Sequence, residues 1–239
     1  MFGKITKGLI VMYDGLITKP PIDELYHHGI KGQKWGVKNG PPYPLKESSA
    51  SEKIYRNAEQ RVDEISKDVI AAAKHAGSKM YGLEHRLKTK DSISRKINKK
   101  SKEDKQSISK SANDIKDAIR FTTISSNDSF VSSYQKVKKE LENKGYVETR
   151  CKNYFDLFNQ GRVKHKSVQS NYKTKDGYEF EIQFQTPESQ DAKNKKIPLY
   201  EERRSLNVSK KRANELEKMM EDLALKVPDP YDIHKIKSH

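Results

Sequence analysis

The stretch from residue 177 to residue 186 carries two glutamates that could bind a divalent cation or accept a proton. Between Phe180 and Phe184, apolar residues alternate with polar ones, which is the period-two pattern of a half-buried strand. Glu179 and Glu181 therefore share the polar face of that strand with glutamines. An ordinary strand with a solvated polar face has the same pattern, so a structural and a catalytic role both stay open.

A second group of residues could hold phosphate groups. Its pattern is Arg86-x-Lys88-x-x-x-Ser92-x-x-x-Lys96. In a helix, Ser92 and Lys96 share one face, while Arg86 and Lys88 enter from the preceding turn. Cations that converge in this way suit a triphosphate, because guanidinium binds phosphate oxygens in pairs and ammonium acts as a point charge. A solvated basic helix would carry the same residue types.

Composition limits the class of protein. The 239 residues allow one fair-sized domain with appendages, and only 33% of them are hydrophobic, so the core is modest. The net charge of +15 favours a polyanionic partner or phosphate-bearing substrates, or serves solubility. The single Cys151 excludes an internal disulfide framework and indicates a reducing compartment. No apolar run approaches the length of a membrane span, so no membrane partner is expected.

Residues 1–45 are predicted to be a flexible leader, because glycine and proline interrupt them throughout. Within the leader, His27 begins the segment HHGIKGQKWGV, whose Trp35 could anchor a partner. This segment resembles a short element of phage and prophage structural proteins of Gram-positive bacteria. The resemblance implies association with phage virion proteins through residues 26–37, and it implies no chemistry.

The rest of the chain predicts an α+β fold, with a mixed sheet of about four to five strands flanked by helices. Residues 46–84 have the apolar spacing of one long helix, with Ser51 as its N-cap. Strands are predicted at 113–124, 146–155, 164–174 and 177–186, with an amphipathic helix before Gly145. The main domain is expected to span 46–205. A C-terminal helix and a loose basic tail would occupy 206–239.

Five motifs occur in an order that resembles the RelA/SpoT-type pyrophosphokinase domain, a family of alarmone synthetases and small toxic relatives. They are the Arg86-to-Lys96 pattern, an aspartate before Ile119-Arg120, the run KNYF at 152–155, the run HKSVQ at 165–169, and the strand at 180–186. The resemblance covers roughly residues 50–205. It implies a nucleotidyltransferase-like synthetase domain that transfers the pyrophosphate of ATP to a ribose 3′-hydroxyl with the help of Mg²⁺.

The resemblance also implies residue roles. Glu181 would be the base and a metal ligand, and an aspartate across the sheet would be the second metal ligand. The ATP-binding residues would be Arg86, Lys88, Ser92, Lys96 and Arg120. The acceptor-binding residues would be His165, Tyr154 and Gln169.

Some positions depart from the family pattern. The family's metal aspartate lies five residues before the strand arginine, where this chain has Ile115. Asp117 is favoured in its place because it directly precedes the apolar strand residues, and Asp114 is the alternative. His165 stands where the family has a tyrosine that stacks on guanine, and Gln169 stands where a histidine is usual. The identity of the acceptor therefore stays open.

Three functions fit these observations. The first is an alarmone-making pyrophosphokinase, and the second is the same transfer to the 3′ end of tRNA, which the basic charge favours. In both, a phage- or prophage-encoded toxin with an antitoxin partner is expected, acting in the bacterial cytoplasm or carried in a phage particle. The third is a non-catalytic phage head-associated protein that retains the fold as a binding module.

Overall fold

The computed structural model describes residues 50–161, 165–203 and 208–239. The leader, including residues 26–37, lies outside these ranges. Within them, none of the helices combines the length and the apolar character that crossing a bilayer requires.

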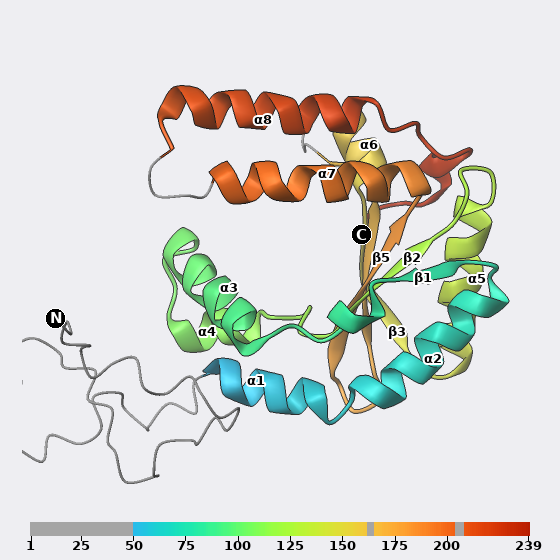
Figure 1. Ribbon diagram of the computed structural model, residues 1–239. Helices are drawn as coiled ribbons and strands as arrows, with labels where there is room; N and C mark the ends of the chain where they lie inside the picture. Colours follow the sequence, from blue (N-terminus) through green and yellow to red (C-terminus); the bar gives the residue numbers. More distant parts are fainter. Residues whose placement is uncertain (1–49, 162–164, 204–207) are drawn as a thin grey trace, which may run out of the picture. The chain divides into compact units, whose positions relative to one another are not determined.

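Five strands form one mixed sheet, which confirms the expected α+β class (Figure 1). The strands are β1 (Lys79–Tyr81), β2 (Arg120–Ile124), β3 (Val147–Asn153), β4 (Val168–Lys173) and β5 (Glu179–Gln185). Their order across the sheet is β1-β2-β5-β4-β3, with β2 and β5 parallel and the other neighbours antiparallel. The sequence did not predict β1, because three residues are too few to show an alternating pattern.

Helices surround this sheet. They are α1 (Ala50–Glu59), α2 (Val62–His75), α3 (Lys90–Glu103), α4 (Ile108–Asn113), α5 (Phe130–Asn143), α6 (Tyr154–Asn159), α7 (Pro187–Arg203) and α8 (Lys210–Leu225), with 3₁₀ turns at Leu83–His85 and Ile233–Lys235. The prediction of one helix over 46–84 was wrong. The chain breaks between α1 and α2, and α2 ends where Gly77 adopts a φ of +73°, a left-handed conformation that glycine tolerates.

The two faces of β5 differ in polarity, as the alternating pattern predicted, but the strand is not half-buried, because Glu181, Gln183 and Gln185 are buried as well. Phe180, Ile182 and Phe184 are buried in the core on the face that α2 and α5 cover. Tyr134 of α5 meets Phe184 edge to face with ring centroids 5.0 Å apart, and Tyr146 meets Phe180 at 5.6 Å. This apolar contact holds the strand in register, so its polar side chains must point to the opposite face.

The C-terminal segment packs against the sheet, so the prediction of a loose tail was wrong. Ile233 and Ile236 are buried in the core. At the end of the chain, His239 N donates to Cys151 O at 2.9 Å, and Cys151 N donates to His239 O at 3.1 Å. The segment thereby occupies hydrogen-bonding groups of β3 that an edge strand would leave unpaired. Two isolated isoleucines among prolines and charged residues gave no periodic signal for this contact.

Asn153 joins β3, α6 and the C-terminal segment. Its fully buried side chain donates to the carbonyl oxygens of Ile233 and Ile236, each at 3.0 Å. Its Oδ1 accepts hydrogen bonds from the backbone nitrogens of Phe155 and Asp156 at 3.1 and 3.3 Å. Asn153 is thus both the N-cap of α6 and the attachment point of the tail.

Replacing Asn153 should therefore destabilise the domain. We expect Asn153→Ala to lower the free energy of unfolding by about 2–4 kcal/mol, because it removes a helix cap and the two buried hydrogen bonds that the amide donates to Ile233 O and Ile236 O. Urea unfolding measures this change. The control is Asn159→Ala, since Asn159 is exposed and bonds Asp229 at the surface. Equal, small effects of the two variants would contradict the assigned role of Asn153.

Candidate active site

The segment from Arg86 to Lys88 lies alongside the entry to β2. Arg120 N donates to Arg86 O at 2.8 Å, and Lys88 N donates to Ala118 O at 2.9 Å. Leu87 forms the antiparallel bridge with Ile119 between these two bonds. Helix α3 begins directly afterwards, capped by Thr89, whose hydroxyl accepts from Ser92 N. These backbone bonds place Lys88 next to the residue that precedes Ala118.

That residue is Asp117, and two lysines meet on its carboxylate. Lys88 Nζ bonds to Asp117 Oδ2, and Lys96 Nζ of α3 reaches the same oxygen at 2.6 Å. Asp117 is only 7% exposed. Burial acts to raise its pKa, but the two ammonium groups outweigh burial and hold the pKa below its usual value. The other oxygen, Oδ1, is buried without a hydrogen-bond partner among the described atoms.

Glu181 lies on the neighbouring parallel strand. It pairs in register with Arg120 of β2, and its backbone nitrogen donates to Ile119 O at 3.1 Å. Its carboxylate faces away from the aromatic core and is also nearly buried, at 7% exposure. Gln183 Nε2 donates to Glu181 Oε1 at 2.7 Å. Of the two carboxylates expected to bind metal, Glu181 is therefore on β5, and Asp117 lies in the segment that leads into its parallel neighbour β2.

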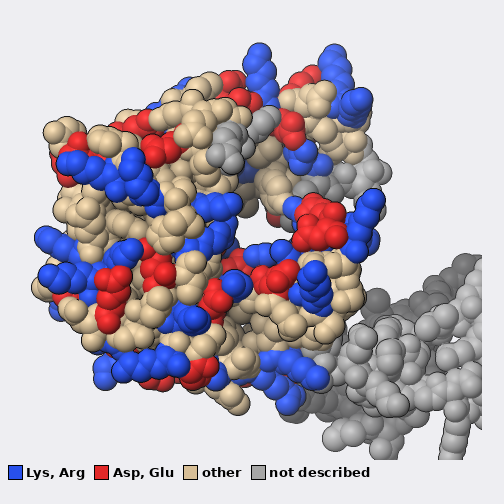
Figure 2. All heavy atoms as spheres, turned by 180° about the vertical axis from the view of Figure 1, so that it is seen from behind, with Lys and Arg blue, Asp and Glu red and all other residues tan. Residues whose placement is uncertain are grey.

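Arg120 affects the pKa values of lysines on both sides of it, Lys88 and Lys193. Burial lowers the pKa of Lys88, Asp117 raises it, and Lys96 and Arg120 lower it, with a net decrease. Arg120 also lowers the pKa of Lys193 on α7. Cations therefore line a region that begins at α3 and reaches α7 across the polar face of the sheet. Figure 2 shows a hollow between α3 and the α7–α8 pair, with basic and acidic side chains around it.

Three residues that the sequence predicted for the site contact groups other than Asp117 and Glu181. They are Arg86, Ser92 and Asp114. The guanidinium of Arg86 donates to Leu83 O at 3.0 Å and approaches Asp63 Oδ1 of α2 at 3.3 Å. Ser92 bonds to neighbours on the surface of α3. Asp114 ends α4, where it accepts from Gln106 at 3.2 Å and pairs with Lys100 at 3.4 Å. The structure thus places Asp117, and not Asp114, beside Lys88 and Lys96.

The residues expected to bind the acceptor lie on the β4 side of Glu181. The rings of Tyr154 and His165 are 4.2 Å apart, and Gln169 of β4 pairs in register with Gln183 of β5. A cavity of about 150 Å³ opens here, with His165, Gln169, Gln183 and Lys193 in its lining. His165 has an exposed edge, yet burial of its ring, together with Lys196 and Lys193, lowers its pKa to about 4. The imidazole is therefore neutral near pH 7.

Sequence reasoning did not single out Gln183 and Lys193. Lys193 Nζ donates to Gln183 Oε1 at 2.7 Å, which connects α7 to the neighbour of Glu181. Lys193 lies in a polar helix among other lysines, so its sequence context does not distinguish it. Gln183 shares the strand face of Glu181, and this spacing was the one available signal.

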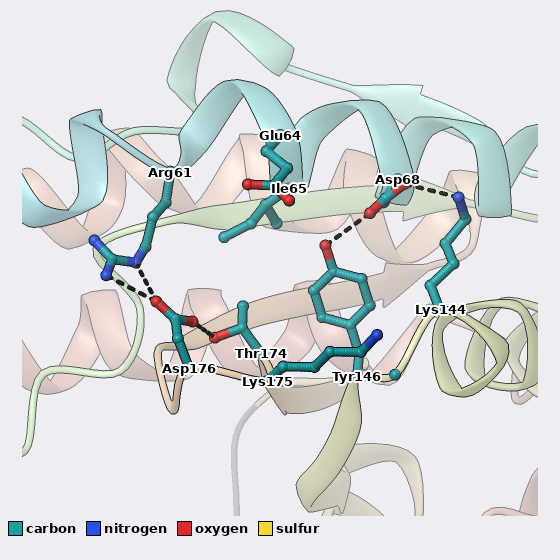
Figure 3. Close-up of a pocket in the computed structure, with 10 residues that line it drawn as sticks. Arg61, Glu64, Ile65, Asp68, Lys144, Tyr146, Thr174, Lys175 and Asp176 are labelled. Atoms are coloured by element: carbon teal, nitrogen blue, oxygen red, sulfur yellow. Dashed lines mark hydrogen bonds and ion pairs between the residues drawn. The ribbon is translucent and has the colours of Figure 1, made fainter.

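A larger cavity, of about 300 Å³, lies elsewhere, beside α2 and the β4–β5 turn (Figure 3). Four of its charged groups form two ion pairs. Arg61 Nη2 lies 2.8 Å from Asp176 Oδ2, and Lys144 Nζ lies 2.7 Å from Asp68 Oδ1. Tyr146 donates to the same Asp68 at 2.8 Å. None of the predicted site residues lines this cavity, so its larger volume does not make it the candidate active site.

Comparisons with solved structures identify the fold. No family model matches the chain, and no curated protein matches it. Among solved structures, small alarmone synthetase 1 from Bacillus subtilis, bound to its product pppGpp, is 16% identical with a TM-score of 0.51. That match covers 73% of this chain and 91% of that one.

Two further structures match with lower TM-scores. The Type VI effector Tas1, in complex with its immunity protein, is 21% identical with a TM-score of 0.46, covering 74% of this chain and 97% of that one. A GTP pyrophosphokinase family protein from Streptococcus pneumoniae is 12% identical with a TM-score of 0.48, covering 77% and 90%. The match to small alarmone synthetase 1 shows that the chain has the fold of the small alarmone synthetases, the fold that the RelA/SpoT resemblance implied.

Proposed function

We propose that this chain is a pyrophosphokinase that transfers the β,γ-pyrophosphate of ATP to the 3′-hydroxyl of a ribose. One observation carries the proposal. Two nearly buried carboxylates lie along the parallel pair β2–β5, Asp117 just before β2 and Glu181 on β5, and lysines converge on the first of them. The fold is shared with a small alarmone synthetase that holds pppGpp, which supports the same class of reaction.

Lys88, Lys96 and Arg120 would bind the triphosphate of ATP. The two ammonium groups now share one carboxylate oxygen, so an entering polyphosphate offers them further anionic partners within reach of their flexible side chains. Arg120, which pairs in register with Glu181, adds a guanidinium that can bind phosphate oxygens in pairs. Such positioning, with electrostatic stabilisation, accounts for most of the catalysis in phosphoryl transfer.

The residues present also fit Mg²⁺. This ion prefers oxygen ligands, and it is usually bound by one or two carboxylates together with substrate phosphates. Asp117 Oδ1 is buried and unpaired among the described atoms, so it offers a free carboxylate oxygen at this place. Asp117 and Glu181 would hold the ion, and its charge would neutralise part of the triphosphate. Asp114, bound to Gln106 and Lys100, is the less suitable ligand.

Glu181 would act as the general base. The acceptor's 3′-hydroxyl oxygen forms a bond to the β-phosphorus, and its proton passes to the Glu181 carboxylate. The bond between the β-phosphorus and the oxygen bridging to the α-phosphate breaks, and AMP leaves with that electron pair. Oε1 of Glu181 already accepts from Gln183, so Oε2 is the oxygen that would receive the proton.

The acceptor would bind near the Tyr154–His165 ring pair, where Gln169 offers an amide group. A neutral histidine can stack on a base, and amides can donate to or accept from its edge. These features suit a purine nucleotide or the terminal adenosine of tRNA. The net charge of +15 supports tRNA as one candidate, since polyanion binding depends largely on neutralising phosphates.

The test is transfer from γ-labelled ATP to GDP, GTP, ADP or tRNA. We expect label in the product of one acceptor class, and that product identifies the acceptor. Folded protein that transfers to none of the four would contradict the proposal and would favour a non-catalytic binding role.

A further inference from the structure

Two side chains connect helix α7 to the proposed base. Lys193 Nζ donates to Gln183 Oε1, and Gln183 Nε2 donates to Glu181 Oε1, both at 2.7 Å. Gln183 is 5% exposed, so its amide has little access to solvent as an alternative partner. The three groups therefore form one hydrogen-bonded row from α7 to β5.

The chemistry of the two ends sets the direction of the amide in the middle. An ammonium group can only donate hydrogen bonds, and an ionised carboxylate can only accept them. Gln183 must therefore turn its oxygen to Lys193 and its nitrogen to Glu181. A glutamine with the opposite orientation would present its oxygen to the carboxylate and its NH2 group to the ammonium. The carboxylate would then lack a donor, the ammonium would lack an acceptor, and both contacts would be repulsive.

We propose that Lys193 is a positioning residue for Glu181, acting through the Gln183 amide. The Lys193 ammonium fixes the orientation of the Gln183 amide, and the amide in turn donates to Glu181 Oε1. Glu181 Oε2 then points toward the hydroxyl of the acceptor. This inference rests on the proposed pyrophosphate transfer. It assigns to α7 a part in the reaction that is separate from binding either substrate.

The charges around Lys193 make the orientation of the Gln183 amide sensitive to pH. Burial and Arg120 of β2 lower the pKa of Lys193 to about 8, although Glu181 of β5 acts to raise it. Lys196 of α7 and His165 before β4 line the same cavity. Above that pH the lysine becomes an amine, which can accept as well as donate, so the amide is no longer held in one direction. The wild-type rate of transfer should therefore fall as the pH rises through about 8.

Three variants test this. We expect Lys193→Met to lower kcat about 10- to 100-fold, a barrier increase of the size that losing one oriented contact produces, with little change in KM for ATP. Lys193→Arg should keep most of the rate and should not show the decline near pH 8, because guanidinium stays protonated. Lys195→Met is the control, since Lys195 is on the same helix but forms an exposed pair with Asp191.

Two results would overturn the proposal. The first is a Lys193→Met variant that raises KM for the acceptor at unchanged kcat, which would make Lys193 a phosphate-binding residue instead. The second is a Lys193→Arg variant that keeps the wild-type decline at high pH.

A measurement without substrates separates this inference from the proposed function. The side-chain amide NMR signal of Gln183 should shift with a midpoint near pH 8 in the wild type and should not shift in Lys193→Met. If transfer is absent but this shift occurs, the proposed function fails while the hydrogen-bonded row stands. If transfer occurs but the amide does not respond to pH or to Lys193→Met, the positioning role fails.

Discussion

Glu181→Gln should abolish pyrophosphate transfer while leaving the fold intact. The substitution keeps the size of the side chain but removes its ability to take the hydroxyl proton. We expect transfer to fall by about 10²- to 10⁴-fold, the usual contribution of a positioned general base. The measurement is labelled-ATP transfer with the best acceptor, together with the thermal midpoint of unfolding.

The matched control is Glu179→Gln, two positions earlier on the same strand. Glu179 pairs with Lys116 at 2.9 Å and accepts from Thr149 at 3.1 Å, so it is committed to structural contacts. This variant should keep its transfer rate within a few-fold of the wild type. If wild-type expression arrests bacterial growth, Glu181→Gln should not, and Glu179→Gln should. Full transfer by Glu181→Gln would remove this residue from the mechanism.

Asp117→Asn should have the second largest effect. The amide is nearly isosteric, but it carries no charge to balance Lys88 and Lys96 and is a weak ligand for Mg²⁺. We expect transfer to fall by about 100-fold or more, in line with losing a charged group that acts on the transition state. The rate should also need more Mg²⁺ to reach its maximum, which a magnesium titration of transfer measures.

Asp117→Asn should also change the acid stability of the protein. The folded-state pKa of Asp117 lies below its ordinary value, so its contribution to stability is complete above the pKa of the unfolded chain, about 3.9. That contribution is lost as the pH falls through the folded-state pKa. Acidification should therefore destabilise the wild type more than Asp117→Asn, as thermal unfolding between neutral and strongly acidic pH can show.

Asp114→Asn is the control for both measurements. Asp114 lies at the end of α4 and is about half exposed, with Gln106 and Lys100 as its partners. Its loss should leave transfer and the magnesium requirement near those of the wild type. If Asp114→Asn removes transfer and Asp117→Asn does not, the metal ligand has been assigned to the wrong aspartate.

Several features of the fold could be predicted from local sequence. The alternation from Phe180 to Phe184 predicted both the strand and the face on which Glu181 lies, because the two-residue period of a strand puts Glu181 on the face opposite Phe180 and Ile182. The spacing from Lys88 to Lys96 predicted that both lysines could serve one anion, and the structure joins both to Asp117. These predictions concern residues whose placement depends on periodicity.

Other features depend on contacts between distant segments. The docking of Ile233 and Ile236 on Asn153 joins residues about 80 positions apart, and neither partner shows a pattern of its own. The break between α1 and α2 and the short β1 likewise depend on what packs against them. No local rule predicts such contacts, because a short segment gains its stability from the surface that it meets.

The sequence by itself determined the α+β class, the polar face of β5 and the set of charged residues available for phosphate chemistry. Only the tertiary structure decided which aspartate meets the lysines and which lysine of α7 reaches Gln183. The chain has a net charge of +15 and many lysines, and the sequence identifies each of them only as a cation. Burial in the folded protein distinguishes Lys88 and Lys193, because it lowers their pKa values and strengthens their interactions with particular neighbours.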